Sequence, residues 1–261
     1  NDFPAGSVWL VGAGPGDAEL LTRKAERLLR TATTIFFDAL VGPDILDLAS
    51  PAARRVYVGK RSGRHSKDQA SIDRLLVDAA LAGARAVRLE GGDPAIFGRA
   101  TEELEACRAA GVLVQVCPGI TAASAAAACL GASLTLRGAA RKLTLVTAHA
   151  RAGEKLSLDW AALADPAATL AIYMGKAAAG EISTQLIGAG LSADTPVALV
   201  ENASLPGERQ LRTRLDLLPL AAAAALGDGP AILLIGEAMR AAKSVSPMRE
   251  PASIDASVPR H

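Results

Sequence analysis

The chain has 261 residues, of which 50% are hydrophobic, 21% charged and 3% aromatic, and its formal net charge is +1. This size and composition predict a globular, soluble protein of one large or two medium domains. Dispersed basic residues and few aromatic side chains argue against a nucleic-acid partner. The sequence has no charge-free apolar run of membrane-spanning length and no signal-peptide pattern at its first residues, so we expect a cytoplasmic protein without a membrane partner.

The first half of the sequence alternates apolar runs with segments of helical periodicity. This βα pattern predicts a parallel-rich α/β domain of five strands. The expected strands span residues 7–12, 34–37, 54–58, 84–90 and 112–116, and the expected helices lie at 19–31, 67–82, 99–110 and 121–130.

Glycines and basic residues in segment 131–142 interrupt the pattern, and a new series of strands and helices follows. We therefore expect two domains, over residues 1–138 and 139–242. Segment 208–215 alternates polar and apolar residues, which predicts some antiparallel pairing. Residues 243–261 are rich in Ser and Pro and predict a disordered tail. The strands expected in this half are 143–149, 168–174, 195–202, 208–215 and 230–239, with helices at 176–189 and 216–225.

Three cysteines, Cys107, Cys117 and Cys129, have neither the paired spacing of zinc ligands nor a histidine close by in the sequence. We expect reduced, mostly buried thiols and no metal site.

The first glycine cluster, GAGPGD at residues 12–17, follows a strand and precedes a helix. Its glycines allow a tight turn and a close approach of a ligand to the backbone. The spacing departs from the dinucleotide fingerprint, and Asp17 at the helix entrance would repel a pyrophosphate while capping the helix. A nucleotide diphosphate is disfavoured, which leaves a cationic or zwitterionic ligand or a plain turn without a ligand.

Two further turns of this kind follow later strands: GGDPAIFGR at 91–99 and PGIT at 118–121, where Thr121 is positioned to cap the next helix. The three loops are expected on one edge of a parallel sheet, where open α/β folds bind ligands. This coincidence favours a binding site over three unrelated turns.

Seven separated motifs, in this order and spacing, resemble the uroporphyrinogen-III C-methyltransferases of the tetrapyrrole methylase family. They read VGAGPGDAELLT, DALV, VGKR, GGDPAIFGR, PGITAASAAA, YMG and VALVEN, and the whole match spans roughly residues 7–240. The resemblance implies two α/β domains with a cofactor cleft between them, a fold unlike the Rossmann methyltransferases. It implies S-adenosylmethionine as cofactor and methylation of uroporphyrinogen III at C2 and C7, giving precorrin-2 for sirohaem, cobalamin or haem d1 synthesis. It also implies a homodimer.

The resemblance further implies which residues contact S-adenosylmethionine. They come from the three glycine loops and from three positions in the second domain. They are Pro15, Gly91, Gly92, Asp93, Ile96, Thr121, Ala122, Met174, Ala203 and Ala231.

Methylation of a pyrrole carbon leaves a cationic ring that must lose a proton, so a carboxylate is needed near the macrocycle. Asp38 matches the family's proposed proton acceptor, and the alternative is that it caps a helix near 43–49. Lys60 matches the proposed proton donor, although its ammonium group is equally suited to binding a propionate.

The tetrapyrrole carries an acetate and a propionate on every pyrrole, which calls for arginines in its site. Glu102 matches a family glutamate near the substrate, and a surface helix glutamate is an equally good interpretation. The arginine candidates are Arg61, Arg64, Arg99 and Arg137.

The sequence departs from the family pattern on the expected substrate side, at Ala95, Ala100, Thr101 and Leu136. Three alternatives to the uroporphyrinogen-III reading follow from the residues. One is a methyltransferase acting on a later precorrin. The others are a nicotinamide-dependent oxidoreductase that uses GAGPGD as its phosphate loop, and a tetrapyrrole carrier that has lost catalysis.

Overall fold

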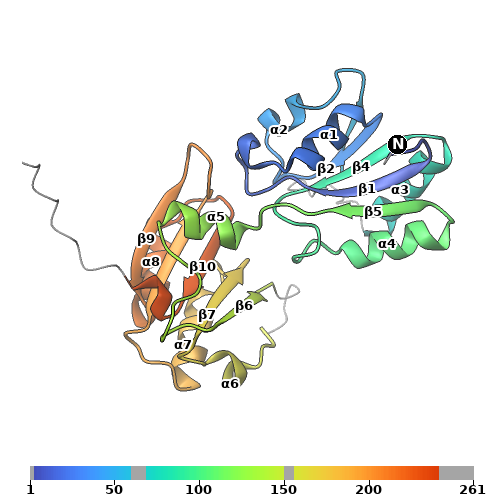
Figure 1. Cartoon of the computed structure of the whole chain (residues 1–261). Helices are drawn as coiled ribbons and strands as arrows, with labels where there is room; N and C mark the ends of the chain where they lie inside the picture. Colours follow the sequence, from blue (N-terminus) through green and yellow to red (C-terminus); the bar gives the residue numbers. More distant parts are fainter. Residues whose placement is uncertain (1–2, 60–68, 150–155, 241–261) are drawn as a thin grey trace, which may run out of the picture.

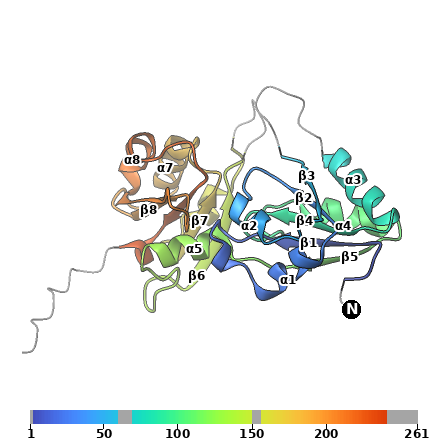
Figure 2. The same ribbon diagram turned by 90° about the horizontal axis from the view of Figure 1, so that it is seen from above.

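The computed structural model describes residues 3–59, 69–149 and 156–240, and it contains two five-stranded sheets (Figure 1). Figure 2 shows the same arrangement from above, with the helices of each sheet gathered around it. The chain completes the first sheet before it begins the second. The predicted α/β class with two successive strand series is confirmed.

The first sheet is parallel, with the strand order β3-β2-β4-β1-β5. Every residue of β1, which lies between β4 and β5, is buried, as expected for an interior strand covered on both faces. The five strands are β1 (Ser7–Gly12), β2 (Thr34–Phe37), β3 (Arg54–Tyr57), β4 (Arg85–Glu90) and β5 (Leu113–Cys117).

Two pairs of helices cover the two faces of this sheet. Helices α1 (Arg23–Thr31) and α2 (Pro43–Asp47) pack on one face, and α3 (Gln69–Leu81) and α4 (Ala100–Ala109) pack on the other. The helix expected at residues 19–31 is divided into a short 3-10 turn, η1 (Ala18–Leu20), and α1. The division arises because each part has its own cap: Asp17 caps η1, and the Thr22 hydroxyl accepts a hydrogen bond from Ala25 N at 3.1 Å.

The second sheet is mixed, with the strand order β6-β7-β10-β8-β9. Strands β6 and β7 are parallel and the remaining pairs are antiparallel, which confirms the pairing predicted for segment 208–215. The strand expected over 230–239 ends earlier because Gly236 has a φ of 140°, and the 3-10 turn η3 (Glu237–Met239) follows. The strands are β6 (Lys142–Thr147), β7 (Ala168–Tyr173), β8 (Pro196–Glu201), β9 (Arg209–Arg214) and β10 (Ala231–Ile235).

Helix α5 (Ala122–Cys129) packs against the second sheet although it directly follows the first (Figure 1). Its buried alanines, Ala123, Ala125 and Ala126, lie with Val200 and other side chains of that sheet in one apolar cluster. Small side chains let a helix lie close to a sheet. The packing therefore unites α5 with the second sheet, whereas the boundary expected at residues 138/139 stays a prediction.

The opposite face of the second sheet is covered by α6 (Trp160–Leu163), α7 (Ala179–Gly188), the 3-10 turn η2 (Leu215–Leu217) and α8 (Leu218–Ala225). Within the described residues, the helices are all too short or too polar to cross a membrane. The tail predicted at 243–261 lies outside the described residues.

Candidate active site at the glycine loops

The three glycine loops leave the first sheet at the carboxyl ends of the neighbouring strands β4, β1 and β5, and they touch one another. Gly14 and Gly92 exchange two backbone hydrogen bonds, with N···O distances of 3.1 and 2.6 Å. A Cβ on Gly12 would lie 2.6 Å from the Gly92 carbonyl oxygen, and a Cβ on Gly119 would collide with that same oxygen. Glycine is required at both positions because a side chain would push the loops apart. The prediction that the three loops share one edge is confirmed.

The carboxylate of Asp93 fastens the second loop to the third. Its Oδ1 accepts a hydrogen bond from Ala95 N at 2.7 Å, and its Oδ2 accepts one from Gly119 N at 3.1 Å. Two backbone donors thus satisfy the charged group inside the protein. The side chain of Asp93 therefore holds the two loops together, and its contact with the cofactor stays a prediction.

Non-glycine residues with positive φ lie in the second glycine loop and in the turns that follow β7 and β8 of the second sheet. Five occur in the described chain, and all follow strands β4, β7 or β8. The left-handed region is unfavourable for residues with a side chain, and such strain gathers at functional sites. The five are Phe97, Arg99, Met174, Asn202 and Ser204, with φ between 53° and 70°.

Tyr173, the last residue of β7, connects the second sheet to the loops of the first. Its hydroxyl is hydrogen-bonded to Thr121 Oγ1 and accepts a hydrogen bond from Ala123 N at 3.2 Å. Its ring centroid lies 5.0 Å from that of Phe97. Thr121 occupies the N-cap position of α5, but its side chain makes no cap bond among the described residues. The prediction that Thr121 caps this helix is wrong, because the Tyr173 hydroxyl binds the free N–H group instead.

The first glycine loop meets the turn that follows β8. Asp17 N donates a hydrogen bond to Ser204 Oγ at 3.2 Å, and the side chain of Leu205 leaves no room for a Cβ on Gly16. The Asp17 carboxylate accepts a hydrogen bond from Glu19 N at 2.9 Å, so it caps the following turn as the sequence predicted. We call the first sheet with its helices the first unit, and the second sheet with α5 to α8 the second unit. Both units therefore contribute to the same group of loops.

The residues expected to bind the cofactor all belong to these loops or lie beside them. Pro15 is half-buried next to Gly16, Ala203 is buried beside Ser204, and Met174 directly follows Tyr173 with 48% of its surface exposed. The structure brings their loops together, and their individual contacts with a cofactor stay predictions.

Asp38 follows β2 on the same edge of the first sheet. Its Oδ1 accepts a hydrogen bond from Leu40 N at 3.0 Å, and its Oδ2 lies 3.3 Å from Arg88 Nη2. Helix α2 is preceded by Gly42, and no side-chain cap bond is found there among the described residues. The alternative that Asp38 caps this helix is therefore wrong. The side chain is fixed by these contacts with Leu40 and Arg88, and it remains 23% exposed to solvent.

Arg88 of β4 is the centre of a buried group that we call the Arg88 cluster, consisting of Arg88, Asp38, Glu90 and Glu103. Its guanidinium lies 2.7 Å from Glu90 Oε1 and 3.2 Å from Glu103 Oε1, besides its contact with Asp38. Burial raises the pKa of Glu90 to about 8; Arg88 opposes this shift, while Glu103 and Asp38 add to it. Burial likewise raises the pKa of Glu103, against the opposing effect of Arg88. Sequence reasoning missed this cluster, because charged residues inside an apolar strand give no sign of their partners.

Two of the predicted substrate residues, Arg99 and Glu102, are paired with each other. The guanidinium makes two contacts with the carboxylate, of 2.7 and 2.8 Å, and both side chains are exposed. The hydrogen bond that Arg99 donates to Glu102 raises the pKa of Arg99. Arg137 is exposed in the segment between α5 and β6. The remaining candidates, Lys60, Arg61 and Arg64, lie outside the described residues.

The thiols of Cys107 and Cys117 are buried, and Cys129 is half-buried; all three are free. This confirms the expectation of reduced, mostly buried cysteines. Among the described residues there is no group of His, Cys, Asp and Glu side chains that could hold a metal ion.

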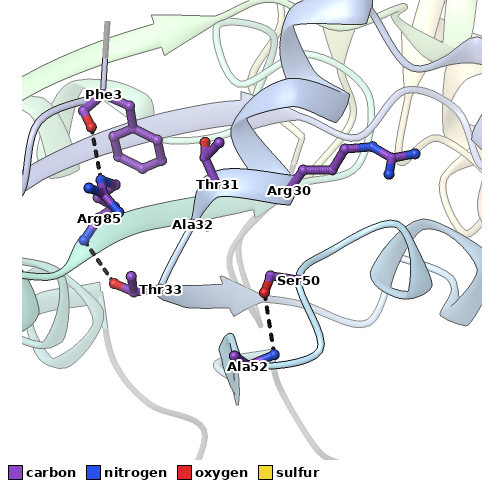
Figure 3. Close-up of a pocket in the computed structure, with 8 residues that line it drawn as sticks. All are labelled: Phe3, Arg30, Thr31, Ala32, Thr33, Ser50, Ala52 and Arg85. Atoms are coloured by element: carbon purple, nitrogen blue, oxygen red, sulfur yellow. Dashed lines mark hydrogen bonds between the residues drawn. The ribbon is translucent and has the colours of Figure 1, made fainter. Parts of the chain in front are cut away.

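A cavity of about 410 Å³ lies at the opposite end of the first sheet (Figure 3). Thr33 precedes β2 and Arg85 begins β4, so this cavity faces the amino ends of the strands. Arg85 donates hydrogen bonds to Phe3 O at 3.1 Å and, through its backbone N, to Thr33 Oγ1 at 2.9 Å. The cavity is therefore separate from the glycine loops. Some of the residues that line it are hydrogen-bonded to one another.

The fold and the site define a two-sheet α/β protein. Its three glycine loops lie on one edge of a parallel sheet, and residues that follow or end strands of a second, mixed sheet contact them. Residues 7–219 match the model of the Tetrapyrrole (Corrin/Porphyrin) Methylases, and the chain belongs to this family. It is 48% identical over 237 residues to the uroporphyrinogen-III C-methyltransferase of Pseudomonas aeruginosa, covering 90% of this chain and 95% of that protein. It is 47% identical over 236 residues to the sirohaem synthase of Gluconacetobacter diazotrophicus, covering 90% of this chain but 50% of that protein. The chain thus spans about half the length of the sirohaem synthases it matches.

Solved structures show the same similarity. The uroporphyrin-III C-methyltransferase of Thermus thermophilus, in complex with S-adenosyl homocysteine, superposes with a TM-score of 0.77 at 39% identity, covering 90% of this chain and 99% of that one. A cobalt precorrin-4 methyltransferase superposes with a TM-score of 0.80 at 29% identity, covering 90% of this chain and 96% of that one. The predicted family and its two-sheet fold are therefore confirmed, which excludes the nicotinamide-dependent oxidoreductase alternative.

Proposed function

We propose that this protein transfers methyl groups from S-adenosylmethionine to C2 and C7 of uroporphyrinogen III, giving precorrin-2 for sirohaem, cobalamin or haem d1 synthesis. One observation carries the proposal: the three glycine loops meet beside Asp38, at the carboxyl edge of the first sheet. The second unit contacts the loops there through Tyr173. Two of the relatives named above support it, because one is named a uroporphyrinogen-III C-methyltransferase and the other a uroporphyrin-III C-methyltransferase. We further propose a homodimer and a cytoplasmic location.

The loops fit a cofactor that lies against the backbone. Gly92 has a φ of 72°, and no described atom lies within 4 Å of the place where its Cβ would be. Met174 and Phe97 are 48% and 40% exposed, and apolar side chains left open beside such a loop are typical of a binding site. When bound, S-adenosylmethionine supplies a methyl group on a sulfonium centre. Loop residues 15, 91–93, 96 and 121–122, with Met174, Ala203 and Ala231, would hold it.

Asp38 would accept the proton that the cationic pyrrole ring loses after the methyl group has been transferred. The hydrogen bond from Leu40 N and the contact with Arg88 fix the direction of its carboxylate. Fixing a catalytic group in advance removes the entropy of orienting it during the reaction. The exposed part of the side chain leaves the carboxylate accessible to a substrate.

The carboxylate groups of the macrocycle would be bound by basic residues beside this edge. Arg99 presents a planar guanidinium that suits a carboxylate, and its exposed pairing with Glu102 contributes little stability, so a substrate carboxylate can replace it. Arg137, Arg61 and Arg64 complete the proposed set. Lys60 would donate a proton or bind a propionate.

A later precorrin is the second candidate substrate, favoured by the structural similarity to the cobalt precorrin-4 methyltransferase. A carrier without catalysis is the third reading, and it differs from both because it predicts binding without methyl transfer.

An anaerobic assay with S-adenosylmethionine and uroporphyrinogen III, read by product mass, tests the proposal. We expect two methyl additions, and a loss of about a hundredfold or more in rate for Asp38→Asn, as for removal of a general base. Asp44→Asn is the matched control, because Asp44 is an exposed carboxylate in the first turn of α2. Cofactor binding without methylation of uroporphyrinogen III would point to the precorrins, which the same assay then tests. An unchanged rate in Asp38→Asn would contradict its role as base.

A further inference from the structure

The Arg88 cluster contains more acid than base. One guanidinium faces the carboxyl groups of Asp38, Glu90 and Glu103, and the side chains of Arg88, Glu90 and Glu103 are 6%, 8% and 1% exposed. If all three carboxyl groups were charged, a largely buried site would hold an excess of two negative charges. Unpaired buried charge is strongly unfavourable, and a buried acid responds by keeping its proton. At least one of the three therefore holds a proton near neutral pH.

Glu103 has better partners for a negative charge than Glu90. Its Oε1 accepts hydrogen bonds from Arg88 and from Gln69 of α3, at 3.2 Å each. Asp73 of α3 also faces it and disfavours its charge. Glu90 receives one contact, from Arg88 to Oε1. In both Glu90 and Glu103 the second oxygen, Oε2, is buried without a hydrogen-bond partner among the described residues.

The unpartnered Oε2 of Glu90 points at the loop that carries the predicted substrate residues. A Cβ on Gly98 would collide with this oxygen and would lie 2.6 Å from the carbonyl oxygen of Pro94. Both oxygens therefore lie beside Gly98. A protonated Glu90 can donate its O–H to an acceptor of this turn, whereas a carboxylate has no proton to donate and would be repelled by a carbonyl oxygen. Gly98 stands between Phe97 and Arg99, both with positive φ, so this turn depends on its surroundings for its shape.

We propose that Glu90 is a positioning residue that acts in its uncharged form: it supports the turn of residues 94–99 and leaves Arg88 to hold the carboxylate of Asp38. The role rests on the proposed function, since it serves the base and the substrate loop of that reaction. Charging Glu90 introduces repulsion toward Pro94 O and a stronger competitor for Arg88. Its raised pKa agrees with this arrangement. The reaction should then fall off as Glu90 loses its proton.

The test is the pH profile of kcat/KM for methylation between pH 6.5 and 9.5, with each enzyme normalised to its own value at pH 7. We expect the wild type to decline above about pH 8, approaching tenfold per pH unit. Glu90→Gln, which is uncharged at every pH, should lose that decline. Glu103→Gln is the matched control, because it also removes a carboxyl group from Arg88 but keeps Glu90, so the decline should persist. Coincident profiles for the wild type and Glu90→Gln would overturn the proposal.

A second measurement needs no methyl transfer, so it separates this proposal from the proposed function. Hydrogen exchange of the backbone amides of residues 95–99 is compared between wild type and Glu90→Gln at the same pH, which cancels the intrinsic exchange rate. We expect faster exchange in the wild type at pH 9 and equal exchange at pH 7. Equal exchange at both values would refute the positioning role, whereas the expected difference in a protein that methylates nothing would refute only the proposed reaction.

Discussion

The titration of Glu90 predicts that the first unit of this protein loses stability as the pH rises from about 5 to 8. In the folded protein this carboxyl keeps its proton up to a pKa of about 8, against an ordinary value of 4.5. Between these values the folded state binds more protons than the unfolded state, so the free energy of unfolding falls with increasing pH. The slope reaches about 1.4 kcal/mol per pH unit midway and is smaller near the two pKa values, so the total is roughly 3.5 kcal/mol between pH 5 and pH 8.

Glu90→Gln removes this dependence, because an amide does not titrate. Relative to the wild type, the variant should therefore gain stability steadily from pH 5 to pH 8. Urea unfolding followed by tryptophan fluorescence measures the difference, with Trp160→Phe as background so that Trp9 alone reports. Trp9 lies in β1, where Lys24 Nζ is 4.1 Å from its ring centroid and Phe3 packs edge-on against it.

The control for this experiment is Glu26→Gln, which removes an exposed carboxylate of the same unit that pairs with Arg30. An exposed pair of this kind contributes about 0.5 kcal/mol, and its loss should not grow over this pH range. If the stability difference between Glu90→Gln and wild type is the same at pH 5 and pH 8, Glu90 is not protonated in the folded protein and the reasoning fails.

Three further predictions concern the loops and the core. Tyr173→Phe removes the hydroxyl that caps α5, so we expect affinity for S-adenosyl homocysteine to fall about fivefold to tenfold by calorimetry; unchanged affinity would separate this contact from the cofactor site. Gly119→Ala should abolish that binding because its Cβ collides with the second loop, whereas Gly180→Ala in α7 meets open space among the described residues and should bind normally. Burial raises the pKa of Cys107 to about 11, with Glu103 and Asp73 adding to it, so iodoacetamide should leave this thiol unmodified at pH 8 until urea unfolds the protein. Mass spectrometry reads the modification, and rapid labelling of the folded protein would contradict the prediction.

The sequence predicted the parts of the fold that follow from local patterns. Apolar runs such as SVWLVG became buried strands, and the order of strands and glycine loops was sufficient to place the three loops on one edge. Asp17 was correctly predicted to cap the turn that follows its loop, because capping depends only on residues close in the chain. Local signals of this kind need no knowledge of distant partners.

The sequence did not predict the features that depend on contacts between distant segments. Tyr173 caps a helix that begins 51 positions earlier in the chain, so nothing near Thr121 indicates it. Arg88 and Glu90 alternate with apolar residues of β4 and resemble an ordinary half-exposed strand until α3 and α4 cover that face. The cofactor contact of Asp93 stays a prediction, and nothing in the sequence indicated that its carboxylate also joins two loops, because Gly119 lies 26 positions further along the chain.

The contacts between the two units coincide with the loops that would bind the cofactor. Asp17 meets Ser204, Thr121 meets Tyr173, and the ring of Tyr173 also touches Phe97. A ligand held by these loops would lie beside the residues that set how the units pack, so we expect binding and packing to be energetically coupled. The strained backbone of Ser204 and Phe97 supports this interpretation, because strain persists only where surrounding contacts hold it. The glycines allow the three loops to lie close together. The second unit, through Ser204 and Tyr173, then restricts the conformation of their backbone.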